Sequence, residues 1–431
     1  MRFILRRLRL LVTAAALAAA VYAPSHPPLD RSPEQAAAPL AVSTTVAGPA
    51  VSVPRLGPEH TGVLLVTGDF LAQRPTVPPP TTTVPRFPPE RTATLLFAGD
   101  FLPHTPVVAA ARAPGGHDFT PMLDAVAPVV SAADVALCHL EVAVSGPGDP
   151  VSGYPLFSAP SEAPAALAGA GFDGCSTASN HSLDRGFDGL SATLEALDAT
   201  GIAHSGTGRT EDEATAPAWY DAAGVRVAHL SYTYGTNGIP LPGHAPWSVR
   251  LLDAGTVAVD AARARAAGAD LVVVSAHWGE EYRQEPTAAQ RVVADEVTRS
   301  GHVDLVVGHH AHVPQTAERV NGRWVLFGLG NFLSNQSAAC CHRAAQDGVV
   351  VSVEVGVGGR RWRDGARVER IVFTPVRVDR AGGYVVIPVG EALAGGPRGT
   401  MGDDELRTSW QRTVEVFARS GDPALVASAA P

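Results

Sequence analysis

The chain has 431 residues, and 45% of them are apolar, which is enough for the packed core of one large domain or two small ones. Its formal net charge of −9 and the lack of a basic stripe argue against nucleic acid as the main partner. The acidic balance by itself names no substrate.

The N-terminus has the charge pattern of an export signal. Several arginines precede an apolar stretch at 10–23, which is shorter than the ~20 apolar residues that a membrane-spanning helix needs. Residues 1–23 are therefore predicted to be a signal peptide, cleaved after Ala23, or an uncleaved N-terminal membrane anchor. Both alternatives predict an exported protein of the cell envelope, membrane-anchored or secreted.

Residues 24–91 are rich in Pro, Thr, Ala and Val and lack helical periodicity, as is typical of an extended linker. Within this linker, residues 62–71 (GVLLVTGDFL) nearly repeat residues 93–102 (ATLLFAGDFL). The second copy leads into an Ala-rich helical stretch, whereas the first leads into runs of Pro and Thr. We therefore expect Asp100 to be functional and Asp69 to belong to an edge strand or a partial duplication.

From residue 92 to about 395, apolar runs alternate with helical stretches in the manner of an α/β domain. Later β-rich runs at 348–356, 367–378 and 384–389 are expected to form a second sheet, and residues 396–431 a loosely attached C-terminal tail. The other strands are expected at 94–99, 134–140, 173–178, 225–231, 270–276, 303–307 and 324–329. Helices are expected near 161–170, 186–200, 257–268 and 286–299.

The four cysteines are Cys138, Cys175, Cys340 and Cys341. Export permits disulfides, and Cys138 and Cys175 each lie near the end of an apolar run. Neighbouring buried thiols are the alternative, and the sequence favours them slightly. Cys340 and Cys341 lack the second Cys pair that would complete a zinc cage.

Polar residues follow the first two expected strands. Asp100 comes after a glycine that permits a tight turn, and its carboxylate suits a hard or borderline dication. A turn or helix-capping role is the alternative for this Asp. His139 and Glu141 share one face of the next strand, because side chains alternate along a strand. They can ligate a metal together, form a ligand with its supporting partner, or be a satisfied polar pair.

The segment 179–186 (SNHSLDRG) is the most enzyme-like of the chain. The side-chain oxygen of Asn180 can bind a metal. His181, oriented by Asp184 three residues later, can protonate a leaving group. The alternative is a helix N-cap at Ser179 or Asn180 with an incidental histidine.

Histidines follow two further apolar runs. His277 comes after a β-branched run typical of a buried parallel strand, so it is expected at the carboxyl end, where open α/β sheets bind their substrates. His310 and His312 follow the run at 303–307, and in an extended segment both imidazoles point the same way, as a metal site requires. Asn331, after a later strand, is expected to order a loop beneath the site.

Together these motifs resemble the CapA (PgsA) family, which is associated with poly-γ-glutamate capsule synthesis and looks like a branch of the calcineurin-like metallophosphatases. The resemblance covers roughly residues 93–390, with matching order and spacing. The segments that carry it are Gly99-Asp100, His139-Leu140-Glu141, Asn180 to Gly186, His277 to Tyr282, His310 to Val313 and Gly330-Asn331-Phe332.

The resemblance implies a metallophosphatase-like four-layer αββα sandwich with two central mixed sheets and metal at the strand ends. It implies two divalent metal ions, for which Mn, Fe or Zn suits the mixed ligands, and it makes His181 the proton donor and Asp184 its orienter. His309 falls outside the implied ligand set. The implied ligands are Asp100, Glu141, Asn180, His277, His310 and His312.

The chain departs from these patterns near Asp100. Metallophosphatases usually have a His two residues after the first Asp, whereas this chain has Leu102, which predicts a first metal that is weakly held or absent. His104 is the nearby substitute. The CapA pattern commonly has Asn where this chain has His139, so His104 and His139 are additional candidate ligands.

Two functions follow as alternatives. In the first, a dinuclear site activates water for attack on a phosphoester or an activated intermediate of envelope polymer synthesis. In the second, a non-catalytic or weakly catalytic component of a membrane capsule assembly complex uses the pocket to bind metal or an anionic envelope polymer. Leu102 favours the second alternative, and the presence of Asn180, His181 and Asp184 together favours the first.

Overall fold

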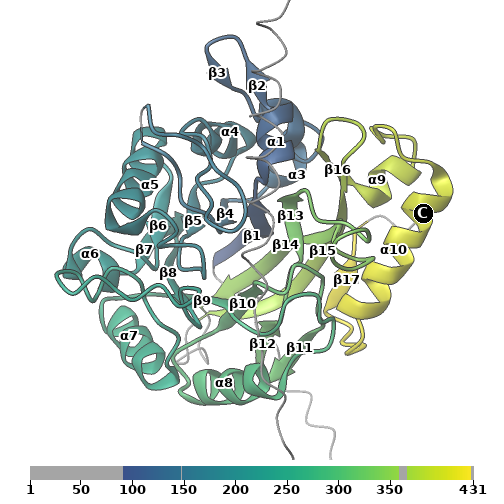
Figure 1. The fold of residues 1–431 in the computed structure, drawn as a ribbon. Helices are drawn as coiled ribbons and strands as arrows, with labels where there is room; N and C mark the ends of the chain where they lie inside the picture. The colour runs from purple at the N-terminus through teal and green to yellow at the C-terminus, as the bar shows by residue number, and fades with distance from the viewer. Residues whose placement is uncertain (1–90, 147, 359–365, 429–431) are drawn as a thin grey trace, which may run out of the picture. The chain divides into compact units, whose positions relative to one another are not determined.

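Two β-sheets pack face to face in the structure, a computed structural model that describes residues 91–146, 148–358 and 366–428 (Figure 1). The expected signal or anchor at 1–23, the linker up to residue 90 and the first repeat copy with Asp69 lie outside the described residues. Within the described part of the chain, no helix is both long and apolar enough to cross a bilayer.

The first sheet is mixed. Its members are β1 (Arg91–Leu102), β4 (Val135–Leu140), β5 (Gly174–Ser176), β6 (Ala203–Ser205), β13 (Asn331–Ser334), β14 (Asp347–Val357), β15 (Arg367–Asp379), β16 (Val385–Pro388) and β17 (Leu425–Ala427). Strands β4, β5 and β6 continue parallel from β1 on one side, whereas β14, β15 and β16 are antiparallel neighbours on the other, where β13 and β17 add short parallel pairings. The order is β16-β15-β14-β1-β4-β5-β6, with β13 beside β1 and β17 beside β15. In β1, Leu95 and Phe97 face the second sheet, whereas Leu96 and Ala98 face outward, as the period of two requires.

The second sheet has a parallel centre and antiparallel edges. Its strands are β7 (Ala218–Ala222), β8 (Val225–Thr233), β9 (Leu271–His277), β10 (Leu305–His309), β11 (Ala317–Val320) and β12 (Arg323–Leu326). They follow the order β11-β12-β10-β9-β8-β7, and β8, β9, β10 and β12 run parallel. Both faces of β9 are buried. Leu271 and Val273 pack toward the first sheet, and Val272 and Val274 pack against the outer helices.

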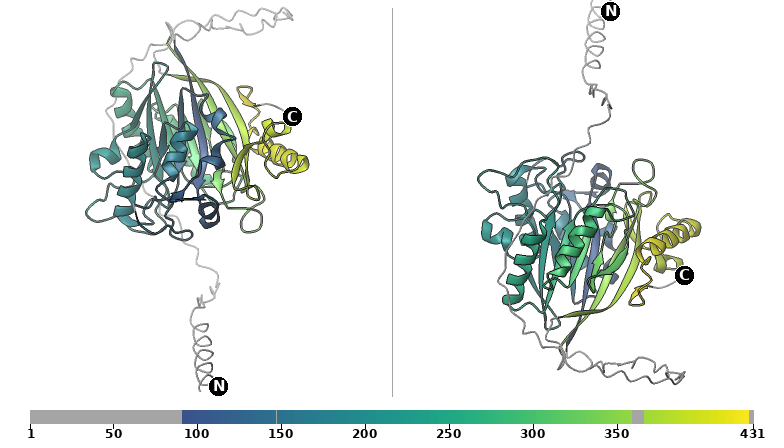
Figure 2. Two further views of the ribbon diagram at one scale, coloured as in Figure 1. Left: turned by 90° about the horizontal axis from the view of Figure 1, so that it is seen from above. Right: turned by 90° about the horizontal axis from the view of Figure 1, so that it is seen from below.

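Helices cover the outer faces and confirm the predicted αββα arrangement (Figure 2). The helices are α1 (Thr105–Ala110), α2 (Thr120–Leu123), α3 (Ala127–Val130), α4 (Ala163–Ala170), α5 (Gly186–Thr200), α6 (Glu211–Thr215), α7 (Ala254–Ala266), α8 (Ala288–Arg299), α9 (Val389–Leu393) and α10 (Asp403–Phe417). A small hairpin of β2 (Arg112–Ala113) and β3 (Gly116–His117) follows α1. Helix α4 packs on the outer face of the first sheet together with α5, and α7 and α8 pack on the second sheet.

The expectation that the late β-rich runs build the second sheet is wrong. Strand β14 pairs antiparallel with β1, and β15 and β16 extend the same first sheet. Val350 of β14 packs with the outer helices, whereas Val351 packs between the sheets. β14 is apolar on both faces because it is a central strand of the first sheet and is covered on both sides. A run of apolar residues does not by itself show which of the two sheets the strand joins.

The expectation of a loosely attached tail at 396–431 is also wrong. Strand β17 pairs parallel with β15, and the ring of Phe417 in α10 lies 4.9 Å from that of Phe373. Leu406 and Trp410 of the same helix pack against Ile387. The described part of the C-terminal segment, through residue 428, thus completes the layer outside β14 and β15.

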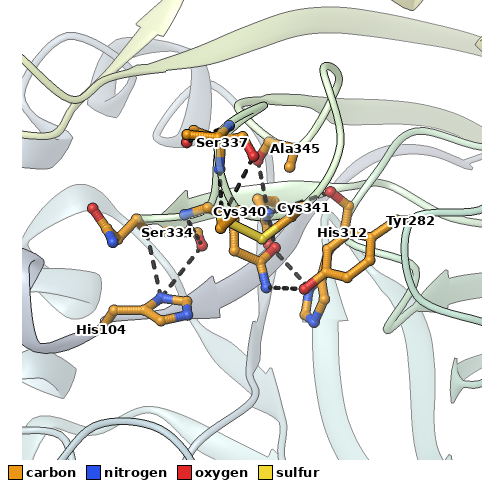
Figure 3. Close-up of a disulfide and its surroundings, with 12 residues drawn as sticks. His104, Tyr282, His312, Ser334, Ser337, Cys340, Cys341 and Ala345 are labelled. Atoms are coloured by element: carbon orange, nitrogen blue, oxygen red, sulfur yellow. Dashed lines mark hydrogen bonds between the residues drawn. A yellow bond between two sulfur atoms is a disulfide. The ribbon is translucent and has the colours of Figure 1, made fainter.

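Both cysteine pairs form disulfides, so the preference for free thiols is wrong. Cys138 and Cys175 lie directly opposite each other on the parallel strands β4 and β5. Cys340 and Cys341 are adjacent in the loop that follows β13, near Ser337 and Ala345 (Figure 3). The first pairing depends on strand register, which the spacing of cysteines along the chain does not reveal.

Asp347 anchors the C-terminal helix to the first sheet. Its buried carboxylate accepts hydrogen bonds from Arg377 at 2.7 Å, from Ser409 at 2.7 Å and from Nε of Arg412 at 2.6 Å. We expect Asp347→Ala to lower the free energy of unfolding by about 3–5 kcal/mol, because it removes the buried carboxylate that Arg377 and Arg412 share and leaves Arg377 only its bond with Glu405. Chemical denaturation measures this change, and the exposed Glu415→Ala in the same helix is the control. Equal stability of the two variants would contradict the assignment.

Candidate metal centre

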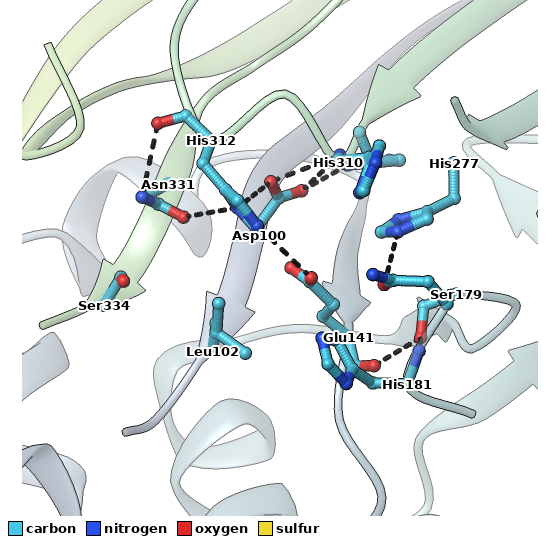
Figure 4. A network of polar contacts seen from close by, with 12 residues as sticks. Asp100, Leu102, Glu141, Ser179, His181, His277, His310, His312, Asn331 and Ser334 are labelled. Carbon is cyan, nitrogen blue, oxygen red and sulfur yellow. Dashed lines mark hydrogen bonds and ion pairs between the residues drawn. The ribbon is translucent and has the colours of Figure 1, made fainter. Parts of the chain in front are cut away.

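The carboxyl ends of strands from both sheets meet at one edge of the sandwich. Strands β1, β4 and β5 are parallel, as are β9 and β10, so each set presents its ends on one side. Figure 4 shows side chains from these ends pointing toward one another. The polar residues gathered there are all buried: Asp100, His139, Glu141, Asn180, His181, His277, His309, His310 and His312.

Glycines allow the backbones to approach closely enough for this convergence. A Cβ atom at Gly99 would lie 2.0 Å from the carbonyl oxygen of Gly330, and the amide of Asp100 donates to that oxygen at 2.9 Å. A Cβ atom at Gly308 would lie 1.9 Å from the carbonyl oxygen of Phe327. Only glycine fits at these two positions, which fix β1 and β10 beside their neighbours.

The expectation of an extended segment at His310 and His312 is wrong. Strand β10 ends at His309, and the φ angles of His310 and His312 are 89° and 56°, a region that non-glycine residues rarely adopt. Two hydrogen bonds hold this conformation. The backbone N–H of Tyr282 donates to the carbonyl of Ala311 at 2.7 Å. The side-chain amide of Asn331 donates to the carbonyl of His312 at 3.3 Å. Backbone strain of this kind is concentrated at functional sites.

Asp100 is buried among histidines. Its carboxylate lies 3.1 Å from Nδ1 of His312 and 3.4 Å from Nδ1 of His309, and it also faces the backbone N–H of His310. Burial opposes the charged form, but the contacts with His309 and His312 hold the pKa of Asp100 well below its usual range. The Asp100 carboxylate therefore stays charged in the interior.

Glu141 lacks the partners that a buried carboxylate needs. Neither of its oxygens has a hydrogen-bond partner among the described residues, and Nε2 of His312 lies 3.6 Å from Oε1. Burial raises the pKa of Glu141 well above its usual value. A buried carboxylate needs a positive charge or hydrogen bonds, and its neighbours here are imidazoles, so the donor set fits a divalent metal.

Three wholly buried groups of ligand atoms can each surround an ion, since the atoms of each group lie within 4.8 Å of one another. Burial lowers the pKa of His277 far below its usual value and that of His310 to about 3, so both imidazoles are in the neutral form that metals bind. The groups are Asp100 with His139 and His309, Asp100 with Glu141 and His312, and Glu141 with His277 and His310.

His139 supports His277 through a chain of buried hydrogen bonds. Nε2 of His139 lies 2.9 Å from Nδ1 of His277, and Nδ1 of His139 lies 2.8 Å from the hydroxyl of Ser176. The other ring nitrogen of His277 faces the side-chain oxygen of Asn180 at 2.8 Å. Such outer partners fix the ring orientation of a ligating histidine. His139 thus lies where it can support His277 and also belongs to a candidate ligand group with Asp100.

His181 and Asp184 form the pair that the sequence predicts. Nδ1 of His181 lies 2.7 Å from Oδ2 of Asp184, and the same oxygen accepts a hydrogen bond from the Phe157 amide at 2.7 Å. The ring of Phe157 meets that of His181 edge-on at 4.8 Å. With Nδ1 directed at the carboxylate, Nε2 is the nitrogen left for proton exchange.

His104 does not replace the missing first-strand histidine in the structure. Its Nδ1 lies 2.9 Å from the carbonyl oxygen of Leu102, and none of the candidate groups found among the described residues contains it. Burial lowers the pKa of His104 to about 4. Leu102 is buried and offers no ligand atom, so the imidazoles beside Asp100 are those of His139, His309 and His312.

Several residues at the centre were not identified from the sequence. His309, which the motif pattern leaves outside the ligand set, stacks on His139 at 4.1 Å and lies beside Asp100. Tyr234, half-exposed after β8, lies 4.7 Å from the ring of His310, and Asn237 accepts a hydrogen bond from Asn180 at 3.2 Å. No sequence motif indicates Tyr234 and Asn237, because only the fold brings the loop after β8 to the site.

Comparison with known families identifies the chain. Residues 94–336, more than half of the 431, match the family model described as bacterial capsule synthesis protein PGA_cap. The chain belongs to this family. The resemblance to CapA proteins that the motifs predict is thereby confirmed.

Two curated relatives of this PGA_cap chain carry the CapA name. The capsule biosynthesis protein CapA of Bacillus anthracis is 32% identical over 185 residues, which are 42% of this chain and 44% of the relative. The PGA biosynthesis protein CapA of Bacillus subtilis (strain 168) is 32% identical over 162 residues, or 37% of this chain and 42% of the relative. The match thus spans less than half the length of either relative.

A solved structure, the calcineurin-like phosphoesterase YfkN from Bacillus subtilis, aligns over 75% of the PGA_cap chain and 97% of its own chain. The TM-score is 0.42 and the sequence identity 13%. No conclusion about activity follows from an alignment at this level.

Metal binding is expected to release a proton. Burial would lower the pKa of His312, but the charges of Glu141 and Asp100 outweigh it and raise that pKa to about 9. The Glu141–His312 pair therefore retains a proton at neutral pH, whereas metal ligation needs the deprotonated groups. We expect Mn²⁺ affinity to rise with pH toward about 9. Titration calorimetry in two buffers of different ionisation enthalpy measures the release, and heats that do not depend on the buffer would contradict it.

Proposed function

We propose that this PGA_cap protein is a metal-dependent hydrolase of the phosphoesterase type that acts in the synthesis of an envelope polymer. The observation that carries this proposal is the His181–Asp184 pair, set 2.7 Å apart beside a buried cluster of carboxylates and imidazoles. A cluster that served only to bind a cation would not need a buried histidine oriented by its own carboxylate.

His181 supplies the proton that a leaving group needs. Asp184 has no exposed side-chain surface, and its oxygen keeps the Nδ1 proton of His181 in place. A protonated His181 then donates from Nε2 to the departing oxygen and returns to the neutral ring, with Nδ1–H still held by Asp184. Phe157 packs edge-on against the ring and limits its rotation.

The residues that would hold metal come from both sheets. Asp100, Glu141 and His312 would hold one ion, and Asn180, His277 and His310, with Glu141 between the two sets, would hold the other. When bound, such ions polarise a phosphoryl oxygen and lower the pKa of a bound water. The mixture of imidazole, amide and carboxylate suits Mn, Fe or Zn.

The setting that we propose is the cell envelope. Disulfides persist in oxidising compartments, and both cysteine pairs of the chain are joined. The CapA relatives are named for capsule or PGA biosynthesis. We therefore propose an exported protein, anchored or secreted, whose substrate is a phosphoester or an anionic envelope polymer and which works with a membrane capsule synthesis complex.

Removal of the proton donor tests the enzymatic proposal. We expect His181→Ala to lower kcat for a generic phosphodiester by about 10²–10⁴-fold in the metal-loaded protein, because the leaving group loses its acid. In Asp184→Asn, the ring of His181 loses the carboxylate that orients it, so we expect a loss of kcat that is smaller than in His181→Ala.

The matched control for Asp184→Asn is Asp198→Asn, which changes a second His–carboxylate pair, that of His204, 3.2 Å apart and outside the cluster. It is expected to leave turnover unchanged. Protein that stays metal-free and inactive after addition of Mn²⁺, or a His181→Ala variant as active as the wild type, would rule out the enzyme and leave a role in binding polymer.

The capsule role predicts a cellular phenotype. Deletion of the gene is expected to remove poly-γ-glutamate from the envelope, and complementation with the wild-type chain to restore it. Complementation with His181→Ala distinguishes a catalytic contribution from a binding one, because a polymer-binding component would still restore the polymer. An unchanged envelope after deletion would contradict the role.

A further inference from the structure

One carboxylate beside the centre is exposed to solvent. Glu281 lies in the turn after β9, and its ligand atom lies within 4.8 Å of ligand atoms of His310 and His312. The other candidate acidic ligands, Asp100 and Glu141, have no exposed surface. Glu281 therefore approaches the centre from the solvent side, where the buried carboxylates do not reach.

Hydrogen bonds hold the turn that carries Glu281 against the histidine segment. The backbone N–H of Trp278 donates to the carbonyl of His309 at 3.3 Å, and that of Tyr282 donates to the carbonyl of Ala311 at 2.7 Å. The indole of Trp278 is buried and donates to the carbonyl of Phe327 at 2.9 Å. Glu281 is flanked by fixed positions on both sides, so its place near His310 and His312 follows from the fold.

Independent evidence for a cation at this place comes from buried atoms without partners. Nδ1 of His310 is buried and makes no hydrogen bond within the described chain, and the same holds for both carboxylate oxygens of Glu141. His310 is only 4% exposed. Buried polar atoms without hydrogen bonds are costly unless a ligand satisfies them.

Glu281 adds an oxygen donor beside two imidazoles. Its ligand atom is grouped with those of His310 and His312, and not with Asp100. Borderline dications that bind imidazole also accept carboxylate oxygen. A carboxylate at this place thus completes a mixed set of one oxygen and two nitrogen ligands.

We propose that Glu281 is an additional carboxylate ligand of the divalent-metal centre, on the side where His310 and His312 lie. This inference rests on the proposed metal centre and adds to it a ligand that can be exchanged. Because the Glu281 side chain is exposed, it occupies the solvent-facing side and can leave when a phosphoester oxygen arrives. The buried ligands are fixed by packing and cannot do so.

Calorimetric titration of the full chain with Mn²⁺ tests the proposal, with metal content measured in parallel. We expect Glu281→Gln to weaken Mn²⁺ binding by about 10-fold or more, since the amide removes a charged ligand but keeps the shape. The control is the neighbouring Glu280→Gln: Glu280 is exposed and pairs with Arg283 at 2.9 Å, and its variant is expected to bind like the wild type. Thermal unfolding in chelator checks that both variants fold equally well.

A third variant, Glu141→Gln, distinguishes a failure of the whole metal centre from a failure of the role of Glu281 alone. If Glu141→Gln loses Mn²⁺ and Glu281→Gln binds it as tightly as the wild type, the centre stands and the role of Glu281 is overturned. If the wild type binds neither Mn²⁺ nor Zn²⁺, the centre itself fails, and the role of Glu281 fails with it. Weaker binding in Glu281→Gln but not in Glu280→Gln supports the proposal.

Discussion

The burial of negative charge between the two sheets is the constraint on which the rest of the site depends. Asp100 and Glu141 have no exposed surface, and a charge removed from water is tolerated only when cations or hydrogen bonds replace the water. His312 lies between the two carboxylates, with one ring nitrogen toward each. Two features place imidazoles around these carboxylates. Glycines let β1 and β10 approach the neighbouring backbone closely, and the residues after β10 have positive φ angles.

Much of the fold was predictable from local sequence. Helix α5 begins and ends as expected, at 186–200, and the runs that became β4, β9 and β14 were located within one or two residues. The pairing of β14 with β1, and the docking of α10, could not be read in this way. Both depend on contacts between segments far apart in the chain, which apolar periodicity does not encode.

The candidate site was predictable to the extent that it lies at strand ends. The carboxyl ends of parallel strands meet at one edge of a sheet, so the proximity of Asp100 and Glu141, which follow neighbouring parallel strands, could be expected from sequence order. The contact of His139 with His277 depends on the distance between two sheets, and the left-handed conformation of His310 depends on its hydrogen-bonded neighbours. Sequence alone therefore left open whether His139 binds metal or supports a ligand.

The division of the ligands between the two sheets has a consequence for the mechanical integrity of the sandwich. Asp100 and Glu141 follow strands of the first sheet, while His277 and His310 follow strands of the second. An ion shared by them would act as a non-covalent cross-link between layers whose inner faces are largely packed with apolar side chains. At a free-ion concentration 100 times the Kd, such a link adds about 2.7 kcal/mol to the stability of the folded state. The supply of metal would then govern how long the folded protein survives, independently of any reaction it carries out.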